Sequence, residues 1–254
     1  MVFRMKGKKI DNLPDILYNE NEPGRPDDNA PITVLERFHD NHPSPDCRSY
    51  KLLGIFLDEH LSLDSHVTHI CSKLTRSLYC IKQAKHIIPP SGLKSLYFAL
   101  IHSHLTYCTL ILNSITSANK LRIEKVQKKA IRIVTNSAYN AHTKPLFIQH
   151  AILPFDKLIT QSQLHFMHAI EYKYAPPSFE DTWQKNRDRD PAVNLRNADD
   201  FYITRPRTET FKKSTFYAIP TAWNELIPEI KLQENKFTFK WALKAHLLDE
   251  IADI

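Results

Sequence analysis

Residues 64–88 read DSHVTHICSKLTRSLYCIKQAKHII, and this stretch decides the fold class. Its apolar residues recur every three or four positions, which is the repeat of one face of an α-helix. They are Val67, Ile70, Cys71, Leu74, Leu78, Ile81 and Ile88. The pattern predicts a helix that begins at Asp64, a residue that can cap the first turn, and ends at Pro89-Pro90.

The helical repeat continues downstream. Ser91 is predicted to open a second helix over 93–112, which is apolar nearly all round and is therefore expected inside a helix bundle. A third helix follows Thr116 or Ser117, and two more are predicted at 154–174 and 237–251. The residues of the third helix expected to face inward are Leu121, Val126, Ala130, Ile131 and Val134.

Residues 1–60 have a different pattern. Short apolar runs at 2–3 and 16–18 predict strands, separated from each other and from the rest by turn-forming Pro, Asp and Asn. A third run, 50–57, has Gly54 inside it, which is typical of a bulge or a close backbone approach. The fold class predicted is therefore mainly α, a helical bundle preceded by a short β and loop segment.

The positive charge is concentrated in one part of the chain. Lys and Arg outnumber Asp and Glu by 34 to 28, and residues 61–136 alone hold eleven basic against two acidic residues. Basic side chains spaced along helix faces can neutralise several phosphates of a nucleic acid at once. The alternative is that these are ordinary solvated helix faces, as most charge runs are.

Other chemistry has weaker support. With only four glycines, phosphate-binding loops are not expected, and the four cysteines lack the spacing of a disulfide framework or zinc ribbon, so they are expected to be reduced. The thirteen histidines include close pairs at 39/42, 66/69, 102/104 and 165/168, but none has the paired spacing of a structural zinc site. No metal site is predicted.

The acidic pairs do not form a catalytic motif. Asp199-Asp200 follows Ala198 and imitates the Ala-Asp-Asp of reverse transcriptases, but it lies in a polar stretch and has no third aspartate on an earlier strand. No catalytic residue is predicted. The sequence has no apolar run long enough to span a membrane and no signal peptide, so we expect a soluble, intracellular protein in the cytoplasm or nucleus.

Five segments together resemble the region that follows the catalytic motif in LINE-type (non-LTR, jockey-like) retrotransposon reverse transcriptases. They occur in the family's order and at its approximate spacing, and they extend over nearly the whole chain. The segments are YKLLGIFLDEHLS (50–62), LYFALIHSHLTY (96–107), VQKKAIRIV (126–134), HTKPLF (142–147) and IPTAWN (219–224).

The resemblance implies a division of the chain into five parts. Residues 1–60 correspond to the edge of the polymerase palm, with Met1–Lys9 as the strand after the catalytic hairpin and Leu53, Gly54 and Ile55 as a primer-grip-like segment. The remaining parts are the thumb-like basic bundle (61–136), a helical extension (137–174), an irregular linker (175–210) and a C-terminal helical segment (211–254).

The function implied is that of the part of an RNA-directed DNA polymerase that holds RNA and RNA/DNA duplex. The fingers, most of the palm and its magnesium-binding aspartates are missing, so the chain is not expected to polymerise alone, to need a cofactor or to bind a small-molecule substrate. Two alternatives stay open: part of an active enzyme completed by upstream sequence, or a degenerate relic without a selected function. The predicted nucleic-acid contacts are Lys73, Arg76, Lys82, Lys85, Lys125, Lys128, Lys129 and Arg132.

Overall fold

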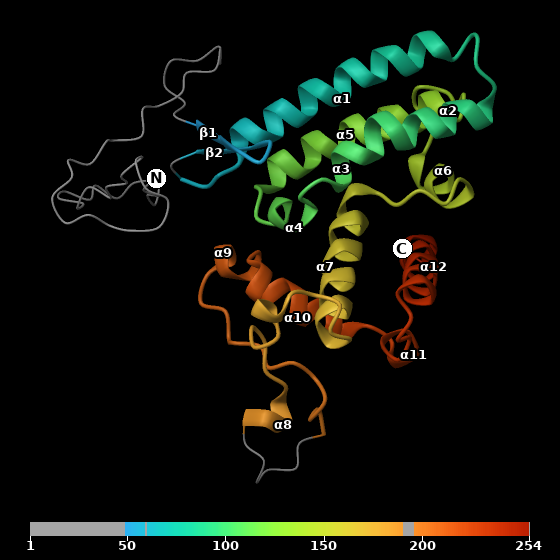
Figure 1. Cartoon of the computed structure of the whole chain (residues 1–254). Helices are drawn as coiled ribbons and strands as arrows, with labels where there is room; N and C mark the ends of the chain where they lie inside the picture. Colours follow the sequence, from blue (N-terminus) through green and yellow to red (C-terminus); the bar gives the residue numbers. More distant parts are fainter. Residues whose placement is uncertain (1–48, 59, 190–195, 254) are drawn as a thin grey trace, which may run out of the picture. The chain divides into compact units, whose positions relative to one another are not determined.

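The computed structural model describes residues 49–58, 60–189 and 196–253 (Figure 1). The chain divides into two compact units, residues 1–69 and 70–254. The described part is mainly helical with one small sheet, which confirms the predicted fold class at that level. The strands predicted at 2–3 and 16–18 lie outside the described residues.

The sheet of the first unit is a tight hairpin. Strand β1 (Ser49–Leu52) pairs antiparallel with β2 (Ile55–Asp58), and Leu52 lies opposite Ile55. The two residues between them, Leu53 and Gly54, have φ of 48° and 84°, the positive values that a two-residue hairpin turn requires. The prediction of one run with a bulge at Gly54 was wrong, because apolar residues on both sides of the glycine hide the change of direction.

Helix α1 (Asp64–Ala84) begins where the sequence predicts. Its predicted apolar stripe is buried at Val67, Ile70, Leu74, Leu78 and Ile81. It ends four residues earlier than predicted, and the next residues form a turn in which the amides of Ile87 and Ile88 both bond to the Ala84 carbonyl. A proline disfavours helical backbone at the residue before it, so Pro89 keeps the helix from extending to Ile88.

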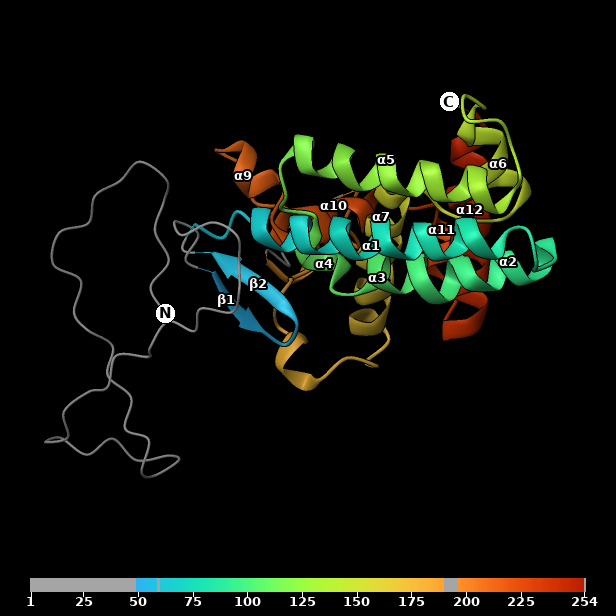
Figure 2. The ribbon, with the colours of Figure 1, turned by 90° about the horizontal axis from the view of Figure 1, so that it is seen from above.

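The second unit contains the remaining helices. Helix α5 contacts α2, α6 and α7, and α7 in turn contacts α3, α4, α10 and α12, so α7 connects the two ends of the unit (Figure 2). The helices are α2 (Pro90–Tyr97), η1 (Phe98–His102), α3 (Ser103–Thr106), α4 (Thr109–Leu112), α5 (Ser117–Val134), α6 (Thr143–Gln149), α7 (Phe155–Glu171), η2 (Pro177–Phe179), α8 (Asn186–Arg189), α9 (Glu209–Lys212), α10 (Thr215–Glu225), α11 (Pro228–Lys231) and α12 (Lys236–Asp253).

The helix predicted over 93–112 is not continuous. Helix α2 passes through the π-helical turn η1 into α3, and then Tyr107 is extended and Cys108 is left-handed with φ 53°. The fully buried residues before this break lie four positions apart, on one face, rather than all round as predicted. They are Leu93, Tyr97, Ile101 and Leu105.

Helix α5 was predicted with the correct start but a displaced inner face. Thr116 caps it, because its Oγ1 accepts the amide of Asn119 at 3.3 Å. Leu121, predicted to face inward, is 52% exposed, whereas Gln127 is 1% exposed. The buried positions of α5 are Asn119, Ile123, Gln127, Ala130, Ile131 and Val134.

Gln127 explains the displacement. Its Nε2 donates to the hydroxyl of Tyr97 on α2 at 3.0 Å and to the carbonyl of Leu153 before α7 at 2.9 Å. A buried amide is tolerated only where its donors are satisfied. A hydropathy pattern assigns a polar residue such as glutamine to the exposed side of a helix. The sequence therefore could not show that Gln127 faces inward.

Residues 211–254 were predicted to be helical, but helix α10 within them was not predicted individually. Helix α10 has Pro220 in its interior, a residue that reads as a helix breaker. The helices predicted at 154–174 and 237–251 are present as α7 and α12. Residues 175–210 contain only short turns of helix and an isolated bridge between Lys185 and Phe201 among the described residues.

His168 is the centre of an aromatic cluster between α7 and α12. It is 1% exposed, its ring stacks on Phe239 at a centroid distance of 4.0 Å, and its Nε2 lies 2.8 Å from the carbonyl oxygen of Gln233. Burial lowers the pKa of His168, with the Gln233 hydrogen bond opposing the effect. One turn earlier, burial and then the charge of Lys240 lower the pKa of His165 to about 4.

We predict that Gln127→Leu lowers the free energy of unfolding by about 2–4 kcal/mol, because it leaves the Tyr97 hydroxyl and the Leu153 carbonyl buried without their donor. Urea titration measures the change. The matched control on the same helix is Leu121→Gln, which alters an exposed side chain and should change stability by less than about 0.5 kcal/mol. Equal effects from the two variants would contradict the proposed role of Gln127.

We also predict a loss of stability in mild acid. The folded pKa values of His165 and His168 lie below that of an unfolded histidine, so the stabilisation is present above pH 6.5 and, for His165, is lost as the pH falls towards about 4. Each such histidine can contribute up to about 1.4 kcal/mol per pH unit in that window. Urea titrations between these limits should show a shallower pH dependence for His165→Gln. A dependence parallel to that of the unmodified protein would exclude His165 as a source.

Candidate nucleic-acid interface

Helices α1 and α5 lie side by side and run in the same direction (Figures 1 and 2). Near their starts, the positive charge of Arg122 partly offsets the burial that raises the pKa of the Cys71 thiol, so these two side chains are close. At their ends, Lys85 and Val134 line one pocket. We call the surface along this contact the α1–α5 seam.

Four basic residues lie on the sides of α1 and α5 that meet at this seam. On α5, Arg122, Lys125 and Lys129 are spaced by three and then four residues, which places them on one helix side. On α1, Lys82 follows Cys71 by eleven residues, which is three helical turns, so it lies on the same side as Cys71. We call Lys82, Arg122, Lys125 and Lys129 the seam bases; all four are exposed.

The three lysines among the seam bases take part in no ion pair among the described residues. Three exposed ammonium groups along one strip therefore keep their charge available for an external anion. Arg122 donates to the side-chain oxygen of Asn119 at 3.0 Å. Arg122 was not among the predicted contacts, although its place in the α5 repeat could have indicated it.

Two predicted contacts on α5 have structural partners instead. Lys128 pairs with Glu124 one turn earlier, at 3.6 Å. The Nε of Arg132 donates to the carbonyl oxygen of Ala141 at 2.8 Å and so holds the loop after α5. Both side chains are half-buried, so they offer less to a ligand than the seam bases.

The predicted contacts on α1 are not all on the seam. Lys73 lies near α3, where its charge adds to the effect of burial in lowering the pKa of His104. Arg76 is exposed, and its Nη2 lies 3.3 Å from the hydroxyl of Ser72. The structure thus separates the eight predicted residues into seam bases, residues with structural partners on α5, Lys73 near α3, Arg76 beside Ser72 on α1, and Lys85 beyond the end of α1.

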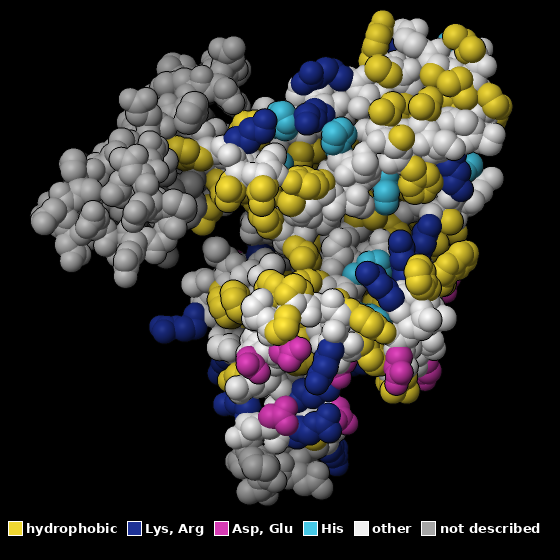
Figure 3. All heavy atoms as spheres, in the orientation of Figure 1, with side chains coloured by type: hydrophobic (Ala, Val, Ile, Leu, Met, Phe, Trp, Pro, Cys, Tyr) yellow, Lys and Arg dark blue, Asp and Glu magenta, His cyan; other side chains and the backbone are white. Residues whose placement is uncertain are grey.

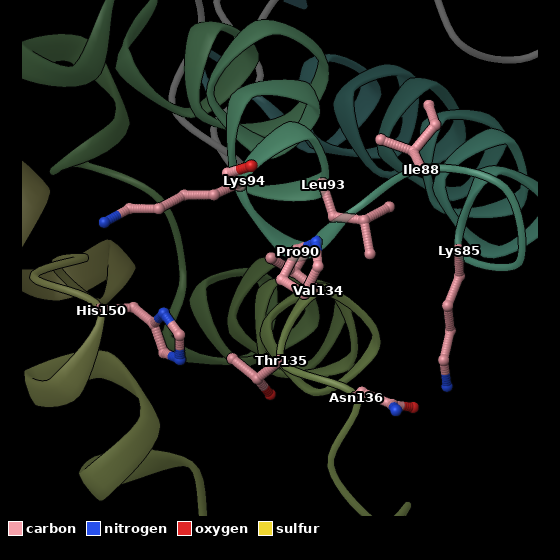
Figure 4. Close-up of a pocket in the computed structure, with 10 residues that line it drawn as sticks. Lys85, Ile88, Pro90, Leu93, Lys94, Val134, Thr135, Asn136 and His150 are labelled. Atoms are coloured by element: carbon pink, nitrogen blue, oxygen red, sulfur yellow. The ribbon is translucent and has the colours of Figure 1, made fainter.

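Lys85 belongs to a pocket of about 450 Å³ at the end of the seam. Figure 4 shows Lys85 and Asn136 on one side of it and Lys94 with His150 on the other. The floor between them is apolar, formed by Pro90, Leu93 and Val134 among others. We call this the end pocket. Sequence reasoning missed Lys94 and His150, because no local pattern relates α2 to the end of α6.

The primer-grip-like residues lie in the first unit. Leu53 is 82% exposed at the hairpin turn, Gly54 is the second turn residue, and Ile55 is buried. The ammonium group of Lys51 lies 5.9 Å from the centroid of the Phe56 ring on the paired strand. The segment thus combines an exposed apolar tip with one cation.

The other motifs have ordinary partners. Asp199 pairs with Arg187 of α8 at 2.8 Å, and Asp200 pairs with Lys231 of α11 at 3.8 Å. Within the described ranges, no three His, Cys, Asp or Glu side chains come together as a metal site would require. His39, His42 and Cys47 lie outside the described residues. No described helix has both the length and the apolar character needed to cross a bilayer.

Comparisons with known proteins leave the chain without an assigned family. No protein-family model, no curated protein and no solved structure matches it.

Proposed function

We propose that this chain is a nucleic-acid-binding segment that holds RNA and RNA/DNA duplex along the α1–α5 seam. The resemblance to LINE-type reverse transcriptases leads to the same function, because it implies that residues 61–136, which contain α1 and α5, form a thumb. On this proposal the chain binds nucleic acid and does not catalyse polymerisation. Magnesium-dependent polymerisation would be carried out by the palm of a complete enzyme of the family.

The observation that carries the proposal is the uncompensated charge of the seam. Lys125 and Lys129 are one turn apart on α5, and Lys82 on α1 extends the strip. From Arg122 to Lys129 the helix rises by about 10 Å, the length of about three phosphates along one strand of a duplex. Contacts of this kind hold the backbone without reading bases, as expected for a polymerase thumb that accepts any template.

Two alternatives to this function make different predictions. The chain is part of an active reverse transcriptase if upstream sequence supplies the palm and fingers, and it is a relic without selected function if the seam binds nothing. The first alternative retains the seam as a duplex-binding surface, so it differs from the main proposal only in what surrounds the chain. The second differs in the binding itself.

We predict that Lys82→Ala/Lys125→Ala/Lys129→Ala weakens binding to an RNA–DNA hybrid by at least about tenfold at 0.1 M salt and lowers the slope of log K against log salt by about 2 to 3. Fluorescence anisotropy of a labelled hybrid measures both. The matched control removes three exposed bases elsewhere, Lys144→Ala/Arg205→Ala/Arg207→Ala, and has the same net charge. Equal weakening in the control would reduce the seam to a general charge effect, and unchanged binding in the seam variant would contradict the proposal.

We further predict no primer extension by the chain with magnesium and deoxynucleotides. The reason is that Asp199 and Asp200 are engaged with Arg187 and Lys231 rather than with each other around a cation site. A primer-extension assay decides the question. Nucleotide incorporation that disappears in Asp199→Asn would show that this pair is catalytic after all.

A further inference from the structure

A second basic surface lies on α12. Phe237, Lys240, Trp241 and Lys244 have the i, i+3, i+4, i+7 spacing that places side chains on one helix face. We call these four residues the α12 face. Phe237 is 76% exposed and Trp241 is 81% exposed. Figure 3 shows dark-blue and yellow side chains close together beside α12.

The lysines of the α12 face repel one another and a lysine of α2. Burial lowers the pKa of Lys244, and the charges of Lys94 and Lys240 lower it further. No ion pair in the part of the chain that the structure describes includes any of these three lysines. Lys94 and Lys244 are half-buried and Lys240 is exposed, and like charges held close together without a counter-ion favour the binding of an external anion.

Two histidines lie beside these lysines. His102 on η1 and His165 on α7 each have a ring nitrogen, Nδ1 and Nε2 respectively, that is closed to solvent and has no hydrogen-bond partner. Lys240 is a source of the low pKa of both rings, after burial in each case, so both rings lie within reach of its charge. Such buried nitrogens cost stability unless something bonds to them. Both nitrogens are closed to solvent, so the two rings mark the inner edge of the α12 face and are not themselves contacts for a bound phosphate.

The exposed rings of Phe237 and Trp241 indicate which kind of anion would bind at the α12 face. A large aromatic ring left in water is unfavourable, and two in succession one turn apart form a platform for stacking. Bases of a single strand stack on such rings while its phosphates meet adjacent lysines, whereas a duplex keeps its bases inside. We propose that the α12 face binds single-stranded nucleic acid, with bases stacked on Trp241 and Phe237 and the backbone held by Lys94, Lys240 and Lys244.

This site is separate from the seam and does not require duplex binding there. Lys94 nevertheless lies in both regions, since it lines the end pocket opposite Lys85 and repels Lys244. Positive charge therefore continues from the end of the seam to α12, within the same compact unit. A strand leaving a duplex on the seam would meet the α12 face next.

The test compares two labelled probes on the full chain, a uridine oligonucleotide of about 12 nucleotides and an RNA–DNA hybrid of the same length. Trp241→Ala should weaken binding of the single strand by about 5- to 100-fold, and Trp241→Phe should restore most of it. Lys240→Gln/Lys244→Gln should lower the salt slope for the single strand by about 1.4. The matched controls are Tyr139→Ala, which removes an aromatic ring that is 85% exposed elsewhere, and Lys144→Gln/Arg205→Gln.

Three results would overturn the proposal. Unchanged single-strand binding in Trp241→Ala would leave only an anion site without stacking. Equal losses in the matched controls would make the effect non-specific. A dimer seen by sedimentation of the free protein and lost in Trp241→Ala would show that a second copy of the chain covers the face.

The seam variant separates this proposal from the preceding one. If it loses the hybrid but keeps the single strand, and the α12 variants lose the single strand, both sites stand. If it keeps the hybrid while the α12 variants lose the single strand, the seam fails and the α12 face stands. If the α12 variants lose neither probe, the α12 face fails, whatever the seam variant does.

Discussion

The buried amide of Gln127 fixes how α5 is turned about its own axis. Its two hydrogen bonds, to the Tyr97 hydroxyl and to the Leu153 carbonyl, join α5 to α2 and to the start of α7. Any rotation of α5 would leave polar groups buried without partners, which is more costly than the loss of an average hydrogen bond. Because the inner face is fixed in this way, the side that carries Lys125 and Lys129 is fixed as well, and both lysines are exposed along the α1–α5 seam.

Whether a basic residue can bind a ligand depends on the partners that it has in this arrangement of helices. A lysine whose partner is a carboxylate on its own helix, such as Lys128 beside Glu124, contributes little to binding, because its charge is already balanced. An arginine that holds a loop, as Arg132 does through Ala141, would have to break a bond to reach a ligand. Among the described basic residues that take part in no ion pair, two groups lie together, the lysines of the seam and the lysines of the α12 face.

The two regions differ in the chemistry placed beside the charge. The seam has a row of lysines and an arginine, with one exposed aromatic ring, Tyr79, one turn before Lys82 on α1, and a row of this kind suits a regular phosphate backbone. The α12 face alternates lysine with Phe237 and Trp241 and has His102 and His165 at its inner edge. Lys94 lies between them, at the end pocket, and makes the positive surface continuous.

The sequence by itself determined the helical class, the starts of α1 and α5, the presence of α7 and α12, and the concentration of basic residues in 61–136. These follow from local periodicity and capping, which act within a few turns of one helix. Only the tertiary structure decided that Leu121 faces water, that residues 50–57 fold back at Gly54, and that Pro220 lies within a helix. It alone also brought Lys94, His102 and His165 to the lysines of α12, because burial and charge pairing depend on neighbours far along the chain.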